Sequence, residues 1–113
     1  MKMIVAVIKP EKLDAVRQAL IDADISRVTV SRVTGHGRQE NIDLYRGQEV
    51  TPDLITKVRL EIAVNDDFVD PAIDAICKAA RENSGSIGDG KIFVMPLEHV
   101  VRIRTREYGG AAV

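Results

Sequence analysis

The chain has 113 residues, of which 45% are hydrophobic and 29% are charged. This length and composition are typical of one globular domain, and they exclude a disordered chain, a collagen-like repeat and a coiled coil. Sixteen Lys and Arg against seventeen Asp and Glu give a net charge of −1, which provides no general attraction to nucleic acid or to a membrane surface. We therefore expect a single domain over 1–113.

Cysteine, histidine and the first apolar run carry little chemistry. Cys77 is the only cysteine, so it forms no internal disulfide and builds no zinc site alone. It lies on the apolar stripe of a predicted helix, which indicates a core thiol. His36 and His99 lack partners at ligand spacing, so no transition-metal site is expected. The run Met3–Ile8 is too short for a signal peptide or a membrane span, and we expect a cytoplasmic protein.

The hydrophobic pattern predicts two helices among five strands. A continuous apolar run predicts a central buried strand, and alternation predicts the others. The first helix follows Lys9, with Pro10 in its first turn. The second helix follows the capping residues Asn65-Asp66-Asp67 and continues to Ala80. Pro71 is expected in its first turn. The predicted strands are Met3–Ile8, Val28–Val33, Val58–Val64, Lys91–Met95 and a short last one at Val100–Thr105.

The predicted order of elements is β-α-β-β-α-β with an extra strand at the end. This is the split-βαβ, ferredoxin-like plan, an α+β fold with both helices on one face of an antiparallel sheet. The other face of such a sheet is bare, so we expect a homo-oligomer that covers it.

The connection between the second and third strands, about 36–56, is too long for a hairpin. Structureless connections longer than about 12–15 residues are usually functional or disordered. Its composition is polar and mixed in charge, with Leu44 and Tyr45 near the middle. These features indicate a recognition arm, and a solvated flap without a role is the alternative.

A glycine-rich stretch, Gly85-Ser86-Ile87-Gly88-Asp89-Gly90-Lys91, precedes the fourth strand. Glycines allow backbone N–H groups to point at an anion, and Lys91 adds a positive charge. The spacing is not that of a Walker loop. The alternative is a helix-to-strand turn whose glycines adopt positive φ.

Arg102 and Arg104 are two residues apart in the last predicted strand, so both are expected on one face. Their fork-shaped donors suit phosphate oxygens. Together with the glycine stretch, Lys91 and Arg38, they would form a polyphosphate pocket. Ordinary surface ion pairs are the alternative.

The motifs together resemble the PII nitrogen-regulatory signalling proteins, and the likeness covers the whole chain. The resemblance implies a homotrimer of ferredoxin-like subunits with nucleotide sites in the clefts between them. It identifies 36–56 with the family's T-loop, 84–91 with its B-loop and 100–113 with its C-terminal segment. The motifs are Gly35-His-Gly37-Arg38-Gln39, Tyr45-Arg46-Gly47, Ser84-Gly-Ser-Ile-Gly88-Asp89-Gly90-Lys91-Ile92-Phe93-Val94 and Arg102-Ile-Arg104-Thr105.

The resemblance also implies ligands and the residues that hold them. ATP or ADP would be bound by Thr29, Gly37, Arg38, Gln39, Val64, Gly88, Asp89, Gly90, Lys91, Arg102 and Arg104. In the presence of ATP, 2-oxoglutarate would be bound by Gly37, Gln39, Lys57 and Gly88, with Mg²⁺ on Gln39. An amide oxygen suits Mg²⁺, which prefers oxygen ligands.

The implied partner is an ammonium transporter or another nitrogen-metabolism protein, contacted through Tyr45 and Arg46 of the arm. Association with a membrane would occur only through the transporter, and no nucleic acid is implied. A glutamine synthetase system or nitrogenase would be regulated in the same way.

The sequence departs from the family's pattern at several places, one of which is Glu40-Asn41 in the arm, where the family usually has Lys-Gly. Val50 stands where related arms have the modified Tyr, so no modification site is expected there. Two residues are added near Glu82-Asn83, and Ser86 stands where a Lys is frequent.

A sensor without catalytic residues is the leading interpretation. A ferredoxin-like phosphotransferase or phosphatase would need a nucleophilic His, and none is legible in the sequence. A trimeric metal-tolerance protein would need a set of His, Cys and carboxylate ligands. These two remain the alternatives.

Overall fold

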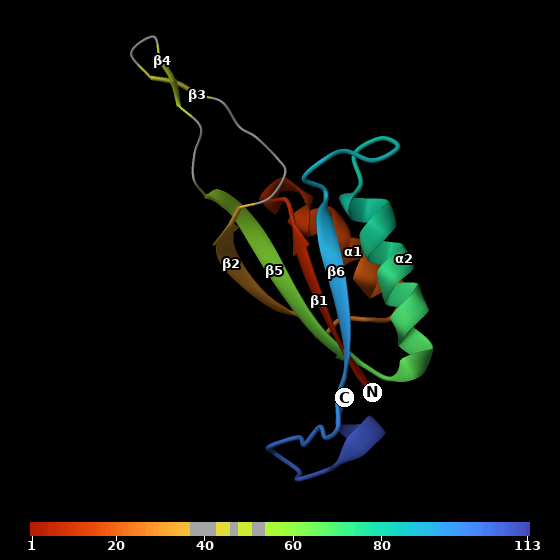
Figure 1. Cartoon of the computed structure of the whole chain (residues 1–113). Helices are drawn as coiled ribbons and strands as arrows, with labels where there is room; N and C mark the ends of the chain where they lie inside the picture. Colours follow the sequence, from red (N-terminus) through yellow and green to blue (C-terminus); the bar gives the residue numbers. More distant parts are fainter. Residues whose placement is uncertain (37–42, 46–47, 51–53) are drawn as a thin grey trace.

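The computed structural model describes residues 1–36, 43–45, 48–50 and 54–113. Four strands form an antiparallel sheet in the order β2-β5-β1-β6 (Figure 1). Combined with two intervening helices, this order is that of the ferredoxin-like α+β fold, as the sequence predicts. The strands are β1 (Lys2–Ile8), β2 (Thr29–Gly35), β5 (Ile55–Val64) and β6 (Gly90–Pro96).

Both helices cover the same face of the sheet (Figure 1). A 3₁₀ turn, η1 (Pro10–Lys12), leads into α1 (Leu13–Asp22), and a second one, η2 (Asp66–Phe68), leads into α2 (Val69–Ala80). Pro10 begins the first turn and Pro71 is in the first turn of α2, as predicted, because proline needs no N–H partner there.

The core lies between the sheet and the helices and consists of aliphatic side chains. Strands β1 and β5 contribute alternate residues, and each helix contributes residues four apart. Burying one such side chain contributes about 1.5–3 kcal/mol to the free energy of unfolding. The core residues are Ile4, Ala6, Ile8, Val16, Leu20, Ile25, Val58, Leu60, Ile62, Val64, Ala72, Ile76 and Ala80.

The prediction that Cys77 is a core thiol is wrong, because its side chain is exposed. In α2 the buried positions are Ala72, Ile76 and Ala80, which are spaced four residues apart. One residue further along a helix is rotated by about 100°, and this rotation takes Cys77 off the buried stripe.

The open face of the sheet carries the opposite set of alternate residues. Met3, Val5 and Val7 of β1 are paired with Met95, Phe93 and Lys91 of β6 in the ladder. Phe93 and Met95 are 49% and 44% exposed. An apolar stripe therefore runs along the β1 and β6 side of this face.

The arm between β2 and β5 contains a small hairpin. Asp43–Tyr45 (β3) pairs antiparallel with Gln48–Val50 (β4), and Figure 1 shows this pair beyond the ends of β2 and β5. Strand β5 begins at Ile55, and Thr56 pairs with Thr34. Ile55 and Thr56 therefore belong to the sheet, and the arm is shorter than the predicted 36–56.

The predicted strand Val100–Thr105 does not form. A single bridge joins Val101 to Tyr108, and the chain turns between them. The Arg106 N–H donates to the Arg102 carbonyl oxygen at 2.7 Å, and Arg106 has a φ of 60°. Apolar alternation alone cannot distinguish a strand from such a turn, because a strand also needs a paired neighbour.

Candidate functional site

The glycine-rich stretch is a tight turn that joins α2 to β6. Gly85, Gly88 and Gly90 all have positive φ, which side chains other than glycine rarely adopt. At Gly90 a Cβ atom would lie 2.0 Å from the Val7 carbonyl oxygen, so only glycine fits there. The glycines therefore have a structural function in this turn, whatever the turn binds.

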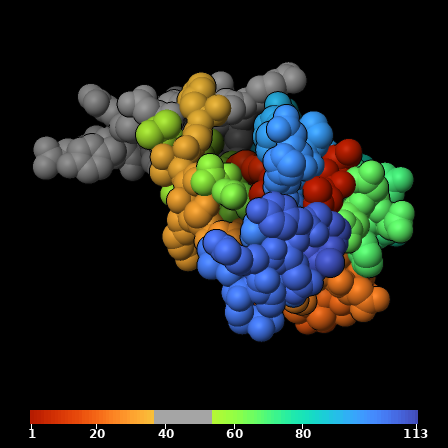
Figure 2. Space-filling model, turned by 90° about the horizontal axis from the view of Figure 1, so that it is seen from below, coloured from red at the N-terminus to blue at the C-terminus, as the bar shows by residue number. Residues whose placement is uncertain are grey.

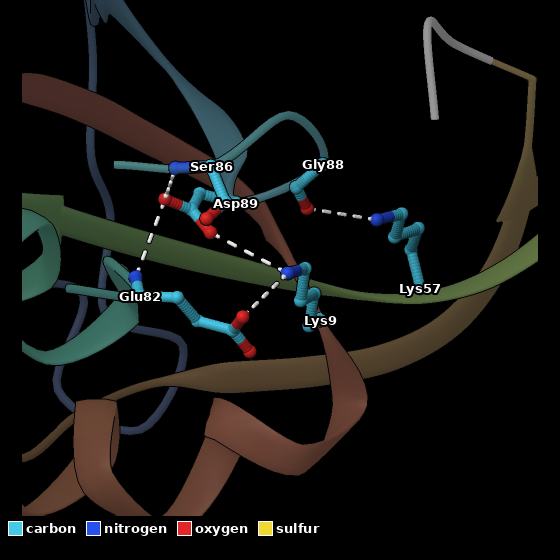
Figure 3. Close-up of polar contacts among 6 residues, drawn as sticks. All are labelled: Lys9, Lys57, Glu82, Ser86, Gly88 and Asp89. Carbon is cyan, nitrogen blue, oxygen red and sulfur yellow. Dashed lines mark hydrogen bonds and ion pairs between the residues drawn. The ribbon is translucent and has the colours of Figure 1, made fainter. Parts of the chain in front are cut away.

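The Asp89 carboxylate organises this turn from within (Figure 3). Its Oδ2 atom accepts hydrogen bonds from the backbone N–H groups of Ser86 at 2.8 Å and Glu82 at 3.3 Å. The bond from Ser86 is the main reason why the pKa of Asp89 lies below its ordinary value. The Asp89 N–H donates to the Ser86 carbonyl oxygen, so this amide is already used inside the turn.

Lys9, at the end of β1, supplies the positive charge that faces this carboxylate. Its Nζ lies 3.4 Å from Glu82 Oε2 and 3.5 Å from Asp89 Oδ1 (Figure 3). Lys9 is only 8% exposed. Burial opposes its charged form, but hydrogen bonding to Glu82 and the charges of both carboxylates outweigh burial and raise the pKa of Lys9.

The sequence analysis did not identify Lys9 and Glu82 as site residues. One signal was available for Lys9, because it directly follows a buried apolar strand. A lysine in such a place is rarely buried unless it is paired.

Lys57 reaches the same turn from β5. Its Nζ donates a hydrogen bond of 3.0 Å to the Gly88 carbonyl oxygen (Figure 3). Burial, followed by the positive charge of Lys9, lowers the pKa of Lys57. The fold thus brings together Lys57 and Gly88. These are two of the residues expected at a 2-oxoglutarate site.

Arg102 and Arg104 do not join the glycine turn in the same chain. The turn ends at Gly90, which pairs with Ile8, whereas β6 ends at Pro96, which pairs with Lys2 at the other end of β1. The C-terminal segment 100–113 lies at that second end, as Figure 1 shows. The length of β6 therefore separates the two halves of the expected polyphosphate pocket within one chain.

Arg102 instead contacts its own C-terminal segment. Its guanidinium lies 3.3 Å from the Glu107 carboxylate and donates to the Ala111 carbonyl oxygen at 3.0 Å. The expectation that Arg102 and Arg104 share a strand face fails together with the strand. Figure 2, seen from below, shows this segment in dark blue over the end of the molecule.

The remaining expected site residues are spread over the sheet. Thr29 begins β2 opposite Glu61 on the open face, whereas Val64 ends β5 on the core face and is 5% exposed. Lys91 is exposed on the open face opposite Val7. Within one chain, Thr29 and Val64 therefore lie on opposite faces of the sheet.

Several expected residues lie in the arm. Gly37, Arg38, Gln39 and Arg46 fall outside the described residues, and Tyr45 and Val50 belong to the β3–β4 hairpin. Among the described residues, no group of three or more His, Cys, Asp or Glu is arranged to hold a metal ion. No helix in the described part of the chain is long and apolar enough to cross a membrane.

Comparison with known proteins identifies the family. The family model "Nitrogen regulatory protein P-II" matches residues 1–107. The chain is 48% identical to nitrogen regulatory protein GlnK1 of Methanosarcina mazei, over all of this chain and 97% of that protein. It is 51% identical to nitrogen regulatory protein P-II of Azospirillum brasilense and 50% identical to nitrogen regulatory protein P-II 1 of Escherichia coli K12, over the full length of each. The chain therefore belongs to the P-II family of nitrogen regulatory proteins and has a role in nitrogen signalling.

Proposed function

We propose that this protein is a non-enzymatic sensor that assembles as a homotrimer of single-domain chains. Each site binds ATP or ADP, and 2-oxoglutarate joins ATP through Mg²⁺. The ligands select the conformation of the arm, which binds an ammonium transporter or another nitrogen-metabolism protein. The regulatory names of the relatives support the absence of catalysis.

The observation that carries this proposal is the separation of the two halves of the anion site. Lys91 and the glycine turn lie at one end of β6, and Arg102 and Arg104 lie beyond the other end. A phosphate chain can contact both halves only if a second copy of the chain contributes one of them. The exposed apolar stripe that includes Phe93 and Met95 offers a surface for this association.

The chain's chemistry fits the proposed ligands. Lys57 and Lys91 are cations close to or within the glycine turn, and cations offset the repulsion between a triphosphate and a dicarboxylate. Gln39 would supply an amide oxygen to Mg²⁺, which prefers oxygen ligands. The bound Mg²⁺ would link ATP and 2-oxoglutarate.

Calorimetry with ATP tests the nucleotide site. In the Arg102→Ala variant we expect a ten- to hundredfold weaker affinity, because a charge-assisted contact contributes about 1.5–3 kcal/mol. Arg17→Ala, which removes the same charge from the exposed side of α1, should keep the wild-type affinity. Unchanged affinity in Arg102→Ala, or steady ATP turnover by the wild-type protein, would contradict the proposal.

Calorimetry with 2-oxoglutarate tests the second ligand. Binding should need both ATP and Mg²⁺ and should disappear in EDTA. Lys57→Ala should weaken 2-oxoglutarate at least tenfold while changing the affinity for ATP much less, because the lost charge faces the dicarboxylate. Equal binding of 2-oxoglutarate without nucleotide would show that Mg-ATP does not form part of the site.

A further inference from the structure

Two lysines approach the same dipeptide of the glycine turn from different strands. Lys9 at the end of β1 faces Asp89 at 3.5 Å, and Lys57 of β5 donates to the Gly88 carbonyl oxygen at 3.0 Å (Figure 3). The positive charge of Lys9 acts on Lys57, whose pKa it helps to lower, and nearby carboxylates oppose this repulsion. The net charge around the turn therefore depends on which carboxylates form ion pairs with Lys9.

Asp89 is one of two carboxylates that lie beside Lys9. Its Oδ2 atom is occupied by the N–H groups of Ser86 and Glu82, so only Oδ1 faces the lysine. This Oδ1 atom is buried and has no hydrogen-bond partner among the described residues. The second negative charge comes from Glu82, whose Oε2 atom lies 3.4 Å from Lys9 Nζ.

Glu82 differs from the other members of the cluster in its exposure and in its place in the sequence. Its side chain is 39% exposed, whereas the side chains of Lys9 and Asp89 are 10% and 15% exposed. It lies where the resemblance to the family implies two added residues. A substitution can therefore remove its charge without disturbing buried packing.

We propose that Glu82 adds a negative charge to the Lys9–Asp89 pair and thereby limits how strongly the Lys57 end of the glycine turn attracts a bound carboxylate. This inference rests on the proposed function, in which Lys57 and Gly88 contact 2-oxoglutarate. Without the charge of Glu82, the cluster of Lys9, Asp89 and Glu82 is neutral and no longer offsets the positive field of Lys57, and little water surrounds Lys9 to screen this change. Glu82 thus determines the affinity for the dicarboxylate without touching it.

The first test measures 2-oxoglutarate binding to the Mg-ATP complex by calorimetry. Glu82→Gln should bind about threefold more tightly at low ionic strength, and the gain should shrink in about 0.5 M salt, where charges are screened over a few ångströms. Glu82→Asp keeps the charge and should bind like the wild type.

Asp74→Asn is the matched control for this test. It also removes one negative charge from an ion pair, with Lys78 at 2.9 Å, but on the exposed side of α2. Its affinity for 2-oxoglutarate should not change. Weaker binding in Glu82→Gln, or an equal gain in Asp74→Asn, would overturn the inference.

The second test needs no ligand and separates this inference from the proposed function. Acetylation of Lys57 by acetic anhydride at fixed pH, followed by mass spectrometry, reports how much of its amine is uncharged. In Glu82→Gln, the loss of one negative charge near Lys9 should make Lys57 react about threefold faster, with Lys78 as an unchanged internal reference. An unchanged rate at Lys57 overturns the inference. A faster rate in a protein that binds no 2-oxoglutarate upholds the coupling and refutes the proposed ligand.

Discussion

Lys9 shows how one residue couples two parts of the chain that are distant in sequence. It ends a strand whose side chains are alternately buried, and its ammonium is paired with carboxylates from the turn between α2 and β6. Such a pair is costly to break, because removing one partner leaves the other charges uncompensated. Lys9 therefore holds the glycine turn against the end of β1.

Lys9→Met should lower the free energy of unfolding by about 2 kcal/mol, because two carboxylates then face each other without a cation. Adding Glu82→Gln to Lys9→Met should recover part of this loss, since one of the two unpaired charges disappears. Urea unfolding of the two single variants and the double variant measures the coupling. Losses that simply add would show that the two residues do not interact.

Asp89 predicts a pH dependence with a definite sign. The backbone N–H of Ser86, followed by the other donors, keeps the pKa of Asp89 below that of an unfolded chain. Its carboxylate therefore stabilises the fold fully above a pH of about 4, and this contribution is lost as the pH falls through the lowered native pKa. The difference in free energy of unfolding between wild type and Asp89→Asn should be constant near pH 6–7 and shrink in acid. A difference that grows in acid would contradict this assignment.

At the scale of elements, the sequence predicts the sheet and both helices because each has a clear period. Buried residues alternate in β1 and β5, and they recur every four residues in α1 and α2. The prediction failed after β6, where alternating residues at 100–105 form a turn with one bridge. Periodicity describes which side chains can share a face, but the pairing partner of a strand comes from tertiary structure.

The candidate site could be predicted only in part for the same reason. The glycine turn was located because glycine and positive φ are linked by local sterics. The ion pairs of Lys9 with Glu82 and Asp89 join residues from distant elements, so no local pattern reveals them. The turn at Arg102 was not predicted, because the strand expected at 100–105 does not form.

The junction between the glycine turn and β6 gives a test at this scale. Gly90→Ala should destabilise the protein by about 2–4 kcal/mol, because the new Cβ would collide with the Val7 carbonyl oxygen and the φ of 121° is strained for alanine. Gly35→Ala is the matched control in β2, where nothing lies within 4 Å of the added atom. Thermal unfolding of both variants measures the effect. A loss in Gly35→Ala as large as that in Gly90→Ala would refute the steric explanation.

At the scale of the whole molecule, the described residues cover the sheet on one face only. The helices bury Ile4, Ala6 and Ile8 of β1, whereas Phe93 and Met95 of β6 remain about half exposed on the other face. Large exposed apolar stripes on a sheet are unfavourable in water and mark surfaces of association. The proposed trimer would bury this stripe and would also bring the two halves of the anion site together.

Phe93→Glu should therefore abolish both assembly and nucleotide binding. Sedimentation should give about 37 kDa for the wild type, as expected for three copies of the 12.4 kDa chain, and a single chain mass for the variant. The free energy needed to bury an unpaired carboxylate in the apolar stripe would exceed the free energy that association releases. ATP affinity should fall with the trimer, because each site needs residues from two copies.

Ile21→Glu places the same charge on an exposed apolar position of α1 and should leave mass and affinity unchanged. A Phe93→Glu protein that sediments as one chain and still binds ATP like the wild type would show that one chain holds the complete site.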